Sequence, residues 1–143
     1  MLFLRKLTRY YRPNVGAKYL AYGQLLRPIE FAAPDPMPVS SYKETYVMEW
    51  TVSRPSLMSG TFRAPNGDIG VFLVNISDKP LRFGFGLPPE KYPVDRRKSY
   101  QVSRVTAKGE RRRAGTLPKG IVSCEGEVPP RDVVLLEAVP ADE

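Results

Sequence analysis

The sequence predicts a mainly β protein, an antiparallel β-sandwich of about seven strands preceded by one kinked helix or two short N-terminal helices. Two observations predict it. The 15 prolines and 11 glycines are spread along the 143 residues and indicate many turns. Beyond residue 42, short strand patterns follow one another at turn-separated intervals, as in sandwiches. The chain is long enough to bury a core without disulfides, since a domain of this size buries roughly 68–70% of its unfolded surface.

Residues 2–26 form the helical part of the prediction, because apolar side chains recur along them with helical spacing. Pro13 removes a backbone donor and disfavours helix at the residue before it. We therefore expect two helices, at residues 2–11 and 14–26, with Asn14 as the N-cap of the second.

The apolar face of this segment needs a partner, because a helix keeps such a face only when it buries it. One alternative is that it packs on the β part of this chain. The other, which the scarcity of further helices favours, is a surface upstream of Met1. The candidate residues for docking on an upstream barrel are Leu4, Leu7, Tyr11, Tyr19 and Leu26.

A proline-rich stretch separates the helical segment from the strands. Residues 32–41 include Pro34, Pro36 and Pro38, which predict a stiff linker. The expected organisation is a terminal helical segment at residues 1–31, the linker at 32–41 and the β-sandwich at 42–143.

The strand patterns lie at residues 45–53, 61–64, 69–76, 81–85, 99–106, 111–114, 121–124 and 132–139. Residues 69–76 are apolar on both faces, which predicts a central strand. Residues 132–139 contain a continuous apolar run and predict a strand that closes the core. Tight turns are expected at Asn66-Gly67 and around Gly109.

Composition excludes several kinds of site. The chain has no histidine, so it lacks the commonest general base and metal ligand. Its single cysteine, Cys124, excludes an internal disulfide and is expected to be a small core residue. Asp68 and Asp78 stand where turns prefer aspartate, and Glu49 lies on the polar face of its strand. We therefore predict no catalytic residue, no metal site and no cofactor in this chain.

Aromatic residues offer a route to carbohydrate binding, because flat rings stack on the apolar faces of sugars. Trp50 and Tyr46 are explained as core residues of their strand. Tyr42 and Tyr92 lie beside loops and are expected to be exposed, so they are the carbohydrate-contact candidates.

The formal net charge of +7 supports an alternative function. Basic residues gather in the helical segment, at residues 96–98 and at residues 111–113. A standalone basic module that binds nucleic acid or another polyanion would use them. No nucleic-acid motif accompanies the charge, which argues against that partner. The chain also shows neither a signal peptide at its start nor a run of ~20 apolar residues, so no membrane partner is expected.

Three segments carry a resemblance to a known group of proteins. Residues 67–78 (GDIGVFLVNISD) resemble a segment of the C-terminal β-sandwich domains that follow amylase-type barrels, and residues 128–137 (VPPRDVVLLE) resemble their closing strand. Residues 19–28 (YLAYGQLLRP) resemble the last barrel helix and its exit in a family of uncharacterised, glycoside-hydrolase-like bacterial proteins.

The resemblance implies a barrel domain as partner, upstream or on a separate chain. It further implies that this chain is a noncatalytic, stabilising sandwich, with carbohydrate contact as an additional expectation. In such barrels the catalytic acids lie at the C-terminal ends of barrel strands. None of those strands is in this sequence, which begins within the expected last helical region of the barrel. No catalytic residue is therefore carried over.

Overall fold

The computed structural model describes residues 2–31, 39–43, 49–53 and 55–141. The helices are α1 (Leu2–Arg9) and α2 (Ala17–Leu20). The strands are β1 (Gln24–Leu25), β2 (Val39–Lys43), β3 (Glu49–Ser53), β4 (Leu57–Arg63), β5 (Ile69–Asn75), β6 (Leu81–Gly86), β7 (Ser99–Val105), β8 (Arg111–Leu117), β9 (Ser123–Val128) and β10 (Asp132–Ala141). The predicted mainly β fold with two short N-terminal helices is confirmed.

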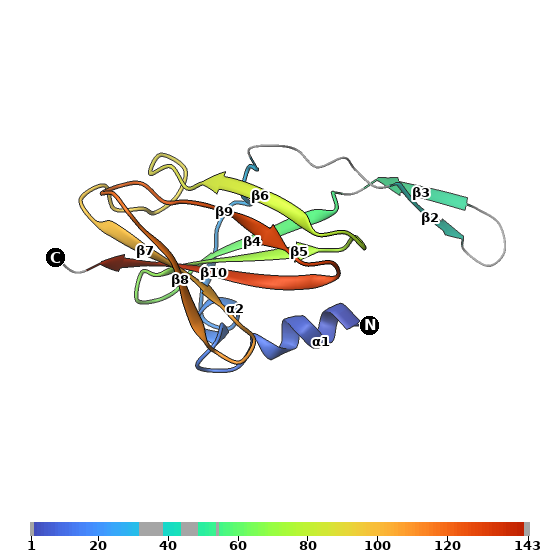
Figure 1. Ribbon diagram of the computed structural model, residues 1–143, viewed down its shortest axis with the longest axis horizontal. Coiled ribbons are helices and arrows are strands. Elements are labelled where there is room, and N and C mark those ends of the chain that lie inside the picture. Colours follow the sequence, from blue (N-terminus) through green and yellow to red (C-terminus); the bar gives the residue numbers. More distant parts are fainter. Residues whose placement is uncertain (1, 32–38, 44–48, 54, 142–143) are drawn as a thin grey trace.

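Two antiparallel sheets face each other (Figure 1). The larger has the order β1-β4-β5-β10-β7-β8, and the smaller is the pair β6-β9. The strands β5 and β10 lie in the middle of the large sheet because both are apolar on both faces. This confirms the central strand predicted from residues 69–76. A separate hairpin, β2-β3, projects away from the sandwich (Figure 1).

The inner core lies between the two sheets. Phe83 and Phe85 of β6 stack with ring centroids 5.9 Å apart and pack on Val71, Val102 and Leu136 of the large sheet. Gly126 of β9 is directly opposite Phe83, and a Cβ at Gly126 would lie 2.9 Å from that ring. The glycine therefore makes room for the ring between the layers.

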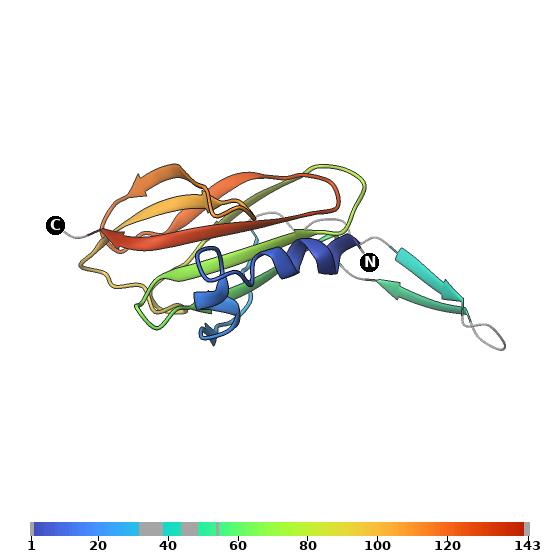
Figure 2. The ribbon, with the colours of Figure 1, turned by 90° about the horizontal axis from the view of Figure 1, so that it is seen from below.

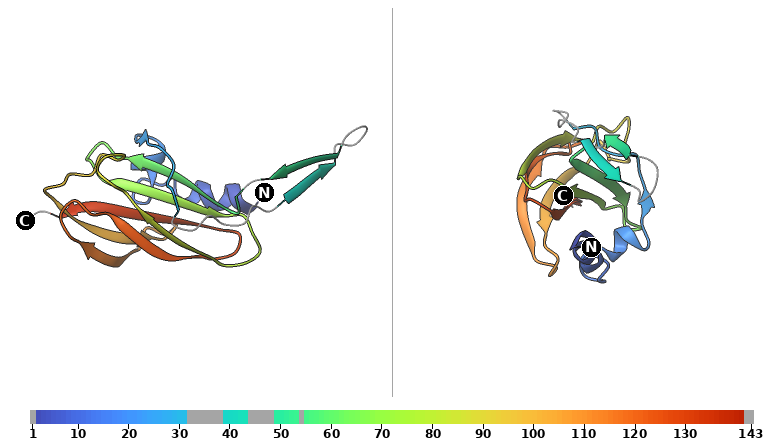
Figure 3. Two further views of the ribbon diagram at one scale, coloured as in Figure 1. Left: turned by 90° about the horizontal axis from the view of Figure 1, so that it is seen from above. Right: turned by 90° about the vertical axis from the view of Figure 1, so that its right-hand side faces the viewer.

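The outer face of the large sheet is covered by the helical segment. Figures 2 and 3 show α1 and α2 lying along this face. Tyr10 and Tyr19 meet Phe72 of β5 edge-to-face, with centroids 5.7 and 6.4 Å away, and Val15 and Leu135 complete the contact. The sequence left two alternatives for the apolar face of the helical segment. These residues of the segment pack on the β part of the same chain, which is the first of the two.

The second helix is much shorter than predicted. It spans Ala17–Leu20 and is preceded by Gly16 rather than capped by Asn14. Residues 24 and 25 form β1, which pairs with β4. After the helix, Gly23 packs directly on the Tyr19 backbone, where a Cβ would approach the Tyr19 carbonyl oxygen to 2.4 Å. The chain then turns to meet the edge of the sheet.

Other boundaries differ by a few residues. The strand expected at 61–64 is the longer β4, and the strand expected at 121–124 is shifted to β9 at Ser123–Val128. The tight turns are confirmed, with positive φ angles of 92° at Gly67 and 89° at Gly109. Residues 32–38 of the expected linker lie outside the described residues, and residues 39–41 begin β2. Within the described part, none of the helices has the length and apolar character needed to span a membrane.

Candidate functional site

A buried carboxylate stands at the centre of the contact between the helical segment and the sheet. Glu137 lies in the middle of β10, opposite Gly70 of β5 and Ser103 of β7, and is only 2% exposed. Its side chain accepts hydrogen bonds of 2.9 Å from the Tyr19 hydroxyl and from Nε of Arg111. The carboxylate thus joins α2, β8 and β10.

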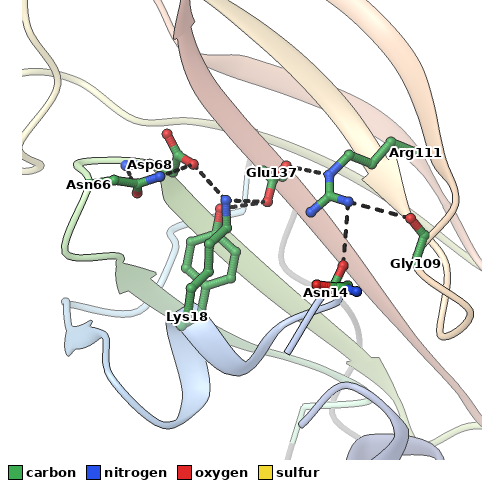
Figure 4. Close-up of polar contacts among 8 residues, drawn as sticks. Asn14, Lys18, Asn66, Asp68, Gly109, Arg111 and Glu137 are labelled. Carbon is green, nitrogen blue, oxygen red and sulfur yellow. Dashed lines mark hydrogen bonds and ion pairs between the residues drawn. The ribbon is translucent and has the colours of Figure 1, made fainter. Parts of the chain in front are cut away.

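A second buried acid lies beside it. Lys18 of α2 places its ammonium 2.9 Å from Glu137 and 2.6 Å from Asp68, as Figure 4 shows. Asp68 is 6% exposed and also accepts a hydrogen bond of 2.9 Å from Nδ2 of Asn66 in the β4–β5 turn. One lysine therefore ties the helical segment to β10 and to that turn.

Arg111 extends the group to the opposite side of Glu137. Its Nη1 contacts the carbonyl oxygens of Asn14 and Gly109, each at 3.4 Å (Figure 4). The β7–β8 turn and the loop between the helices are thereby held together. We call Lys18, Tyr19, Asp68, Arg111 and Glu137 the Glu137 cluster.

The pKa values in the cluster follow from burial and pairing. Burial raises the pKa of Glu137, but the hydrogen bonds from Arg111, Lys18 and Tyr19 outweigh it and hold that pKa below its ordinary value. Burial, together with the adjacent Glu137 carboxylate, raises the pKa of the Tyr19 hydroxyl well above 10. The hydrogen bond to Glu137 likewise raises the pKa of Arg111. At neutral pH the Glu137 carboxylate is thus ionised, with cationic and neutral donors around it.

This arrangement suits a structural cross-link better than acid–base catalysis. A general acid or base needs a pKa near the working pH and a position that substrate can reach. The pKa of Glu137 is shifted away from neutrality, and its two oxygens are occupied by three donors of the same chain. In the described part of the chain, no group of three or more acidic or cysteine side chains is arranged to hold a metal ion.

Of the two carbohydrate-contact candidates, Tyr92 is placed differently from the expectation. Tyr92 is 5% exposed, and its hydroxyl donates a hydrogen bond of 2.8 Å to the Pro28 carbonyl oxygen. The expectation of an exposed ring at Tyr92 is therefore wrong: the ring fills the inner core beneath the loop that follows β6. Tyr42 lies in β2 opposite Trp50, and its side chain is outside the described part.

The residues proposed to dock on a barrel occupy three environments. Tyr19 is fully buried in the Glu137 cluster, while Leu7 and Leu26 are half-buried on the outer and inner cores of this chain. Tyr11 is 52% exposed. Leu4 lies in α1, with its side chain outside the described part. Docking on a barrel stays a prediction, and Tyr11 is the member of the set with a surface-exposed ring.

Cys124 is buried in the inner core, as expected for a small apolar residue. Its thiol lines a void of about 10 Å³ bounded by Val71, Phe85 and Leu136, and burial raises its pKa. A protonated, enclosed thiol is a poor nucleophile.

Sequence reasoning missed the Glu137 cluster. Its members come from four distant segments, so no local motif contains them. One signal was present: Glu137 is a single acid within the apolar run at 133–139, where a charge needs a buried partner.

Comparisons with known proteins give distant likenesses. No family model matches the chain, and no curated protein sequence matches it. Among solved structures, it is similar to a protein described as a "putative alpha-N-acetylgalactosaminidase" from Bacillus halodurans, with 16% identity and a TM-score of 0.46 over 62% of this chain and 19% of that one. It is also similar to the catalytic domain of GH30 xylanase C from Talaromyces cellulolyticus, with 15% identity and a TM-score of 0.33 over 66% of this chain and 20% of that one. The chain thus spans about a fifth of the length of each.

Proposed function

We propose that this chain is a noncatalytic accessory unit of a glycoside-hydrolase-like protein. In this role the sandwich fixes the helical segment in one orientation, and the segment contacts a barrel domain. The resemblance of residues 67–78 and 128–137 to the sandwich domains that follow amylase-type barrels supports the proposal. These residues include β5 and most of β10, the two central strands of the large sheet.

The observation that carries the proposal is the clamp on α2. Two consecutive residues of this helix, Lys18 and Tyr19, bind the same buried carboxylate of β10. Tyr10 adds a hydrogen bond of 3.1 Å from its hydroxyl to the Val133 carbonyl oxygen. A segment held in this way moves with the sandwich as one rigid body, which is what an accessory domain needs in order to position a neighbour.

The outward side of the same segment has the apolar character of a contact surface. Tyr11, Tyr22 and Leu25 are 52%, 76% and 68% exposed. Exposed apolar area of this kind is available to a partner. The barrel domain is the partner that the resemblance implies for this region.

A noncatalytic role agrees with the state of the buried acids. Glu137 and Asp68 are both paired with Lys18, and Glu137 also with Arg111. Carbohydrate contact is a secondary part of the proposal and rests on Tyr42, because the Tyr92 ring is buried. A glycan array tests it: saturable binding that Tyr42→Ala abolishes supports the contact, and binding unchanged by this substitution contradicts it.

Self-association of the purified chain tests the contact surface. We expect sedimentation velocity to show oligomers, and a hydrophobic dye to bind, because Tyr22 and Leu25 expose apolar area. The Tyr22→Lys/Leu25→Lys double variant should be monomeric, while the control Ile121→Lys, at an exposed apolar residue outside the segment, should behave as wild type. A wild-type protein that is monomeric and binds no hydrophobic dye would contradict the proposal.

The mass of the native species in the source cells tests whether a barrel domain is the partner. An antibody raised against residues 45–143 reports the mass of the native species. A species much larger than this chain, with a barrel domain in its sequence, supports the accessory role. If neither a larger species nor a co-purifying barrel protein is detected, the accessory role is overturned.

A further inference from the structure

The strand β8 forms an open edge of the large sheet. It is the last strand in the sheet order, and residues 111–114 are all exposed. A Cβ built at Gly115 would meet no atom within 4 Å. In the described part of the chain, β7 is the only segment whose backbone is hydrogen-bonded to β8. The outer backbone edge of β8 is therefore unpaired among the described residues.

Arginines project from both faces of the edge. In the β7–β8 register Arg112 is opposite Arg104, and Arg113 is opposite Ser103. Residues directly opposite each other share a face, and successive residues of a strand alternate between faces. Arg112 and Arg104 therefore share one face, while Arg113 lies on the other with Arg111, which reaches the Glu137 cluster.

The Arg104–Arg112 pair has no acidic partner within the described residues. Arg104 donates a hydrogen bond of 3.2 Å to the Glu127 carbonyl oxygen, and neither guanidinium forms an ion pair with another described residue. Like charges directly opposite each other on neighbouring strands destabilise a sheet. A carboxylate supplied from outside would relieve this repulsion.

The backbone of the edge is also available. The Thr106 N–H donates a hydrogen bond of 2.9 Å to the Glu110 carbonyl oxygen, so these two opposite residues form a hydrogen-bonded pair. In an antiparallel ladder, hydrogen-bonded pairs alternate with pairs whose backbone groups point away from each other. Two residues further along each strand, Arg104 and Arg112 form the next hydrogen-bonded pair. Arg113 belongs to the following pair, so its N–H and C=O point away from β7. An extended polypeptide can pair with such groups.

We propose that β8 binds an acidic, extended polypeptide segment, which adds to the large sheet as a further strand. Carboxylates on one face of the segment would pair with Arg112 and Arg104, and those on the other face with Arg113. A polyanion lying on one face would reach only one of these sets and leave the outward backbone groups unpaired. A second copy of this chain would place arginine against arginine.

Fluorescence anisotropy tests the proposal with a labelled peptide of about eight residues in which Glu-Glu and Val-Val pairs alternate, so that both faces of the extended peptide carry carboxylates. We expect saturable binding to the intact chain that weakens as salt is added. Arg112→Glu should weaken it about tenfold or more, because a like charge then faces the peptide. The matched control is Arg63→Glu, an equal charge change at an exposed residue of β4 far along the sheet order.

A second pair of variants isolates the backbone. Arg113→Ala removes the side chain but keeps the outward N–H, whereas Arg113→Pro removes both, and proline is tolerated on edge strands. The proposal requires Arg113→Pro to weaken binding several-fold more than Arg113→Ala, with both variants folded by circular dichroism. Equal losses in the two variants would overturn strand addition. So would binding of single-stranded DNA or heparin as tight as that of the peptide, or no peptide binding at low salt.

Discussion

Tyr19 and Glu137 are 118 positions apart in the sequence, yet the Tyr19 hydroxyl donates a hydrogen bond of 2.9 Å to the Glu137 carboxylate. The same tyrosine ring lies on Gly70, where a Cβ would come within 2.7 Å of it. A single side chain thus links α2 to the two central strands, β5 and β10. The helical segment is consequently part of the sandwich rather than an appendage to it.

Removing the buried carboxylate should be strongly destabilising. In Glu137→Ala the donors Tyr19 and Arg111 lose their acceptor, and breaking a buried ion pair in this way costs about 3–5 kcal/mol. Urea unfolding of the variant and wild type measures the difference. The control Glu127→Ala, at an exposed residue of β9, should change stability by less than about 0.5 kcal/mol. Equal effects at the two positions would contradict a structural role for Glu137.

Acid should weaken the fold through the same residue. The folded-state pKa of Glu137 lies below the ordinary value of 4.5, so its contribution is fully present above that value and is lost as the pH falls through the folded-state pKa. The free energy of unfolding of the wild type should therefore drop more steeply below about pH 4.5 than that of Glu137→Gln, which has no carboxyl group to titrate. Parallel pH profiles for the two proteins would contradict this assignment.

A methyl group at Gly70 should loosen the helical segment. In Gly70→Ala the new Cβ would lie 2.7 Å from the Tyr19 ring, and overpacking of this kind costs about 1–3 kcal/mol. Thermal unfolding measures the loss, and hydrogen exchange should show faster exchange at α2. The matched substitution Gly115→Ala meets no atom within 4 Å and should leave stability nearly unchanged. A loss at Gly115 as large as at Gly70 would contradict the close contact as the cause.

Tyr92 should behave as a core residue. Tyr92→Phe removes the hydrogen bond to the Pro28 carbonyl oxygen and should cost about 0.5–1.5 kcal/mol. Tyr92→Ala should cost about 3–5 kcal/mol, because it leaves a cavity in the inner core. Denaturant unfolding of both variants checks the order. A stable Tyr92→Ala protein would show instead that the ring contributes little to the core.

Asn75 should be sensitive to the loss of a single hydrogen-bond donor. Its buried Nδ2 donates to the carbonyl oxygens of Lys79, Val128 and Pro129, at 2.7, 3.1 and 3.1 Å. In Asn75→Asp a carboxylate would face these three acceptors, which should cost at least about 2 kcal/mol at neutral pH. The loss should shrink in acid, where the carboxyl group is protonated and can donate. A pH-independent loss would contradict this reason for the asparagine.

The sequence was informative where burial decides the structure and less so where close contacts decide it. Residues 69–76 are apolar on both faces, which predicted a central strand, and residues 132–139 contain a continuous apolar run, which predicted a strand that closes the core; β5 and β10 are the two central strands. Residues 14–26 have helical spacing, yet α2 ends at Leu20, and the turn that follows brings Gly23 onto the Tyr19 backbone. Such a contact cannot be seen in a periodicity.

The candidate site illustrates the same limit. The Glu137 cluster joins residues from α2, the β4–β5 turn, β8 and β10, and no spacing in the sequence brings them together. Tyr92 was expected to be exposed because it lies beside a loop. It is buried because its loop folds back over the inner core, where Pro28 accepts its hydrogen bond.

The central position of β10 has a consequence for synthesis on the ribosome. This strand follows all the others in the sequence, yet it pairs with both β5 and β7 and carries Glu137. Until it leaves the exit tunnel, β5 and β7 each lack a neighbour, and Lys18, Tyr19 and Arg111 lack their shared acceptor. The nascent chain therefore exposes unpaired, apolar strand edges until β10 emerges, and during that time aggregation competes with folding.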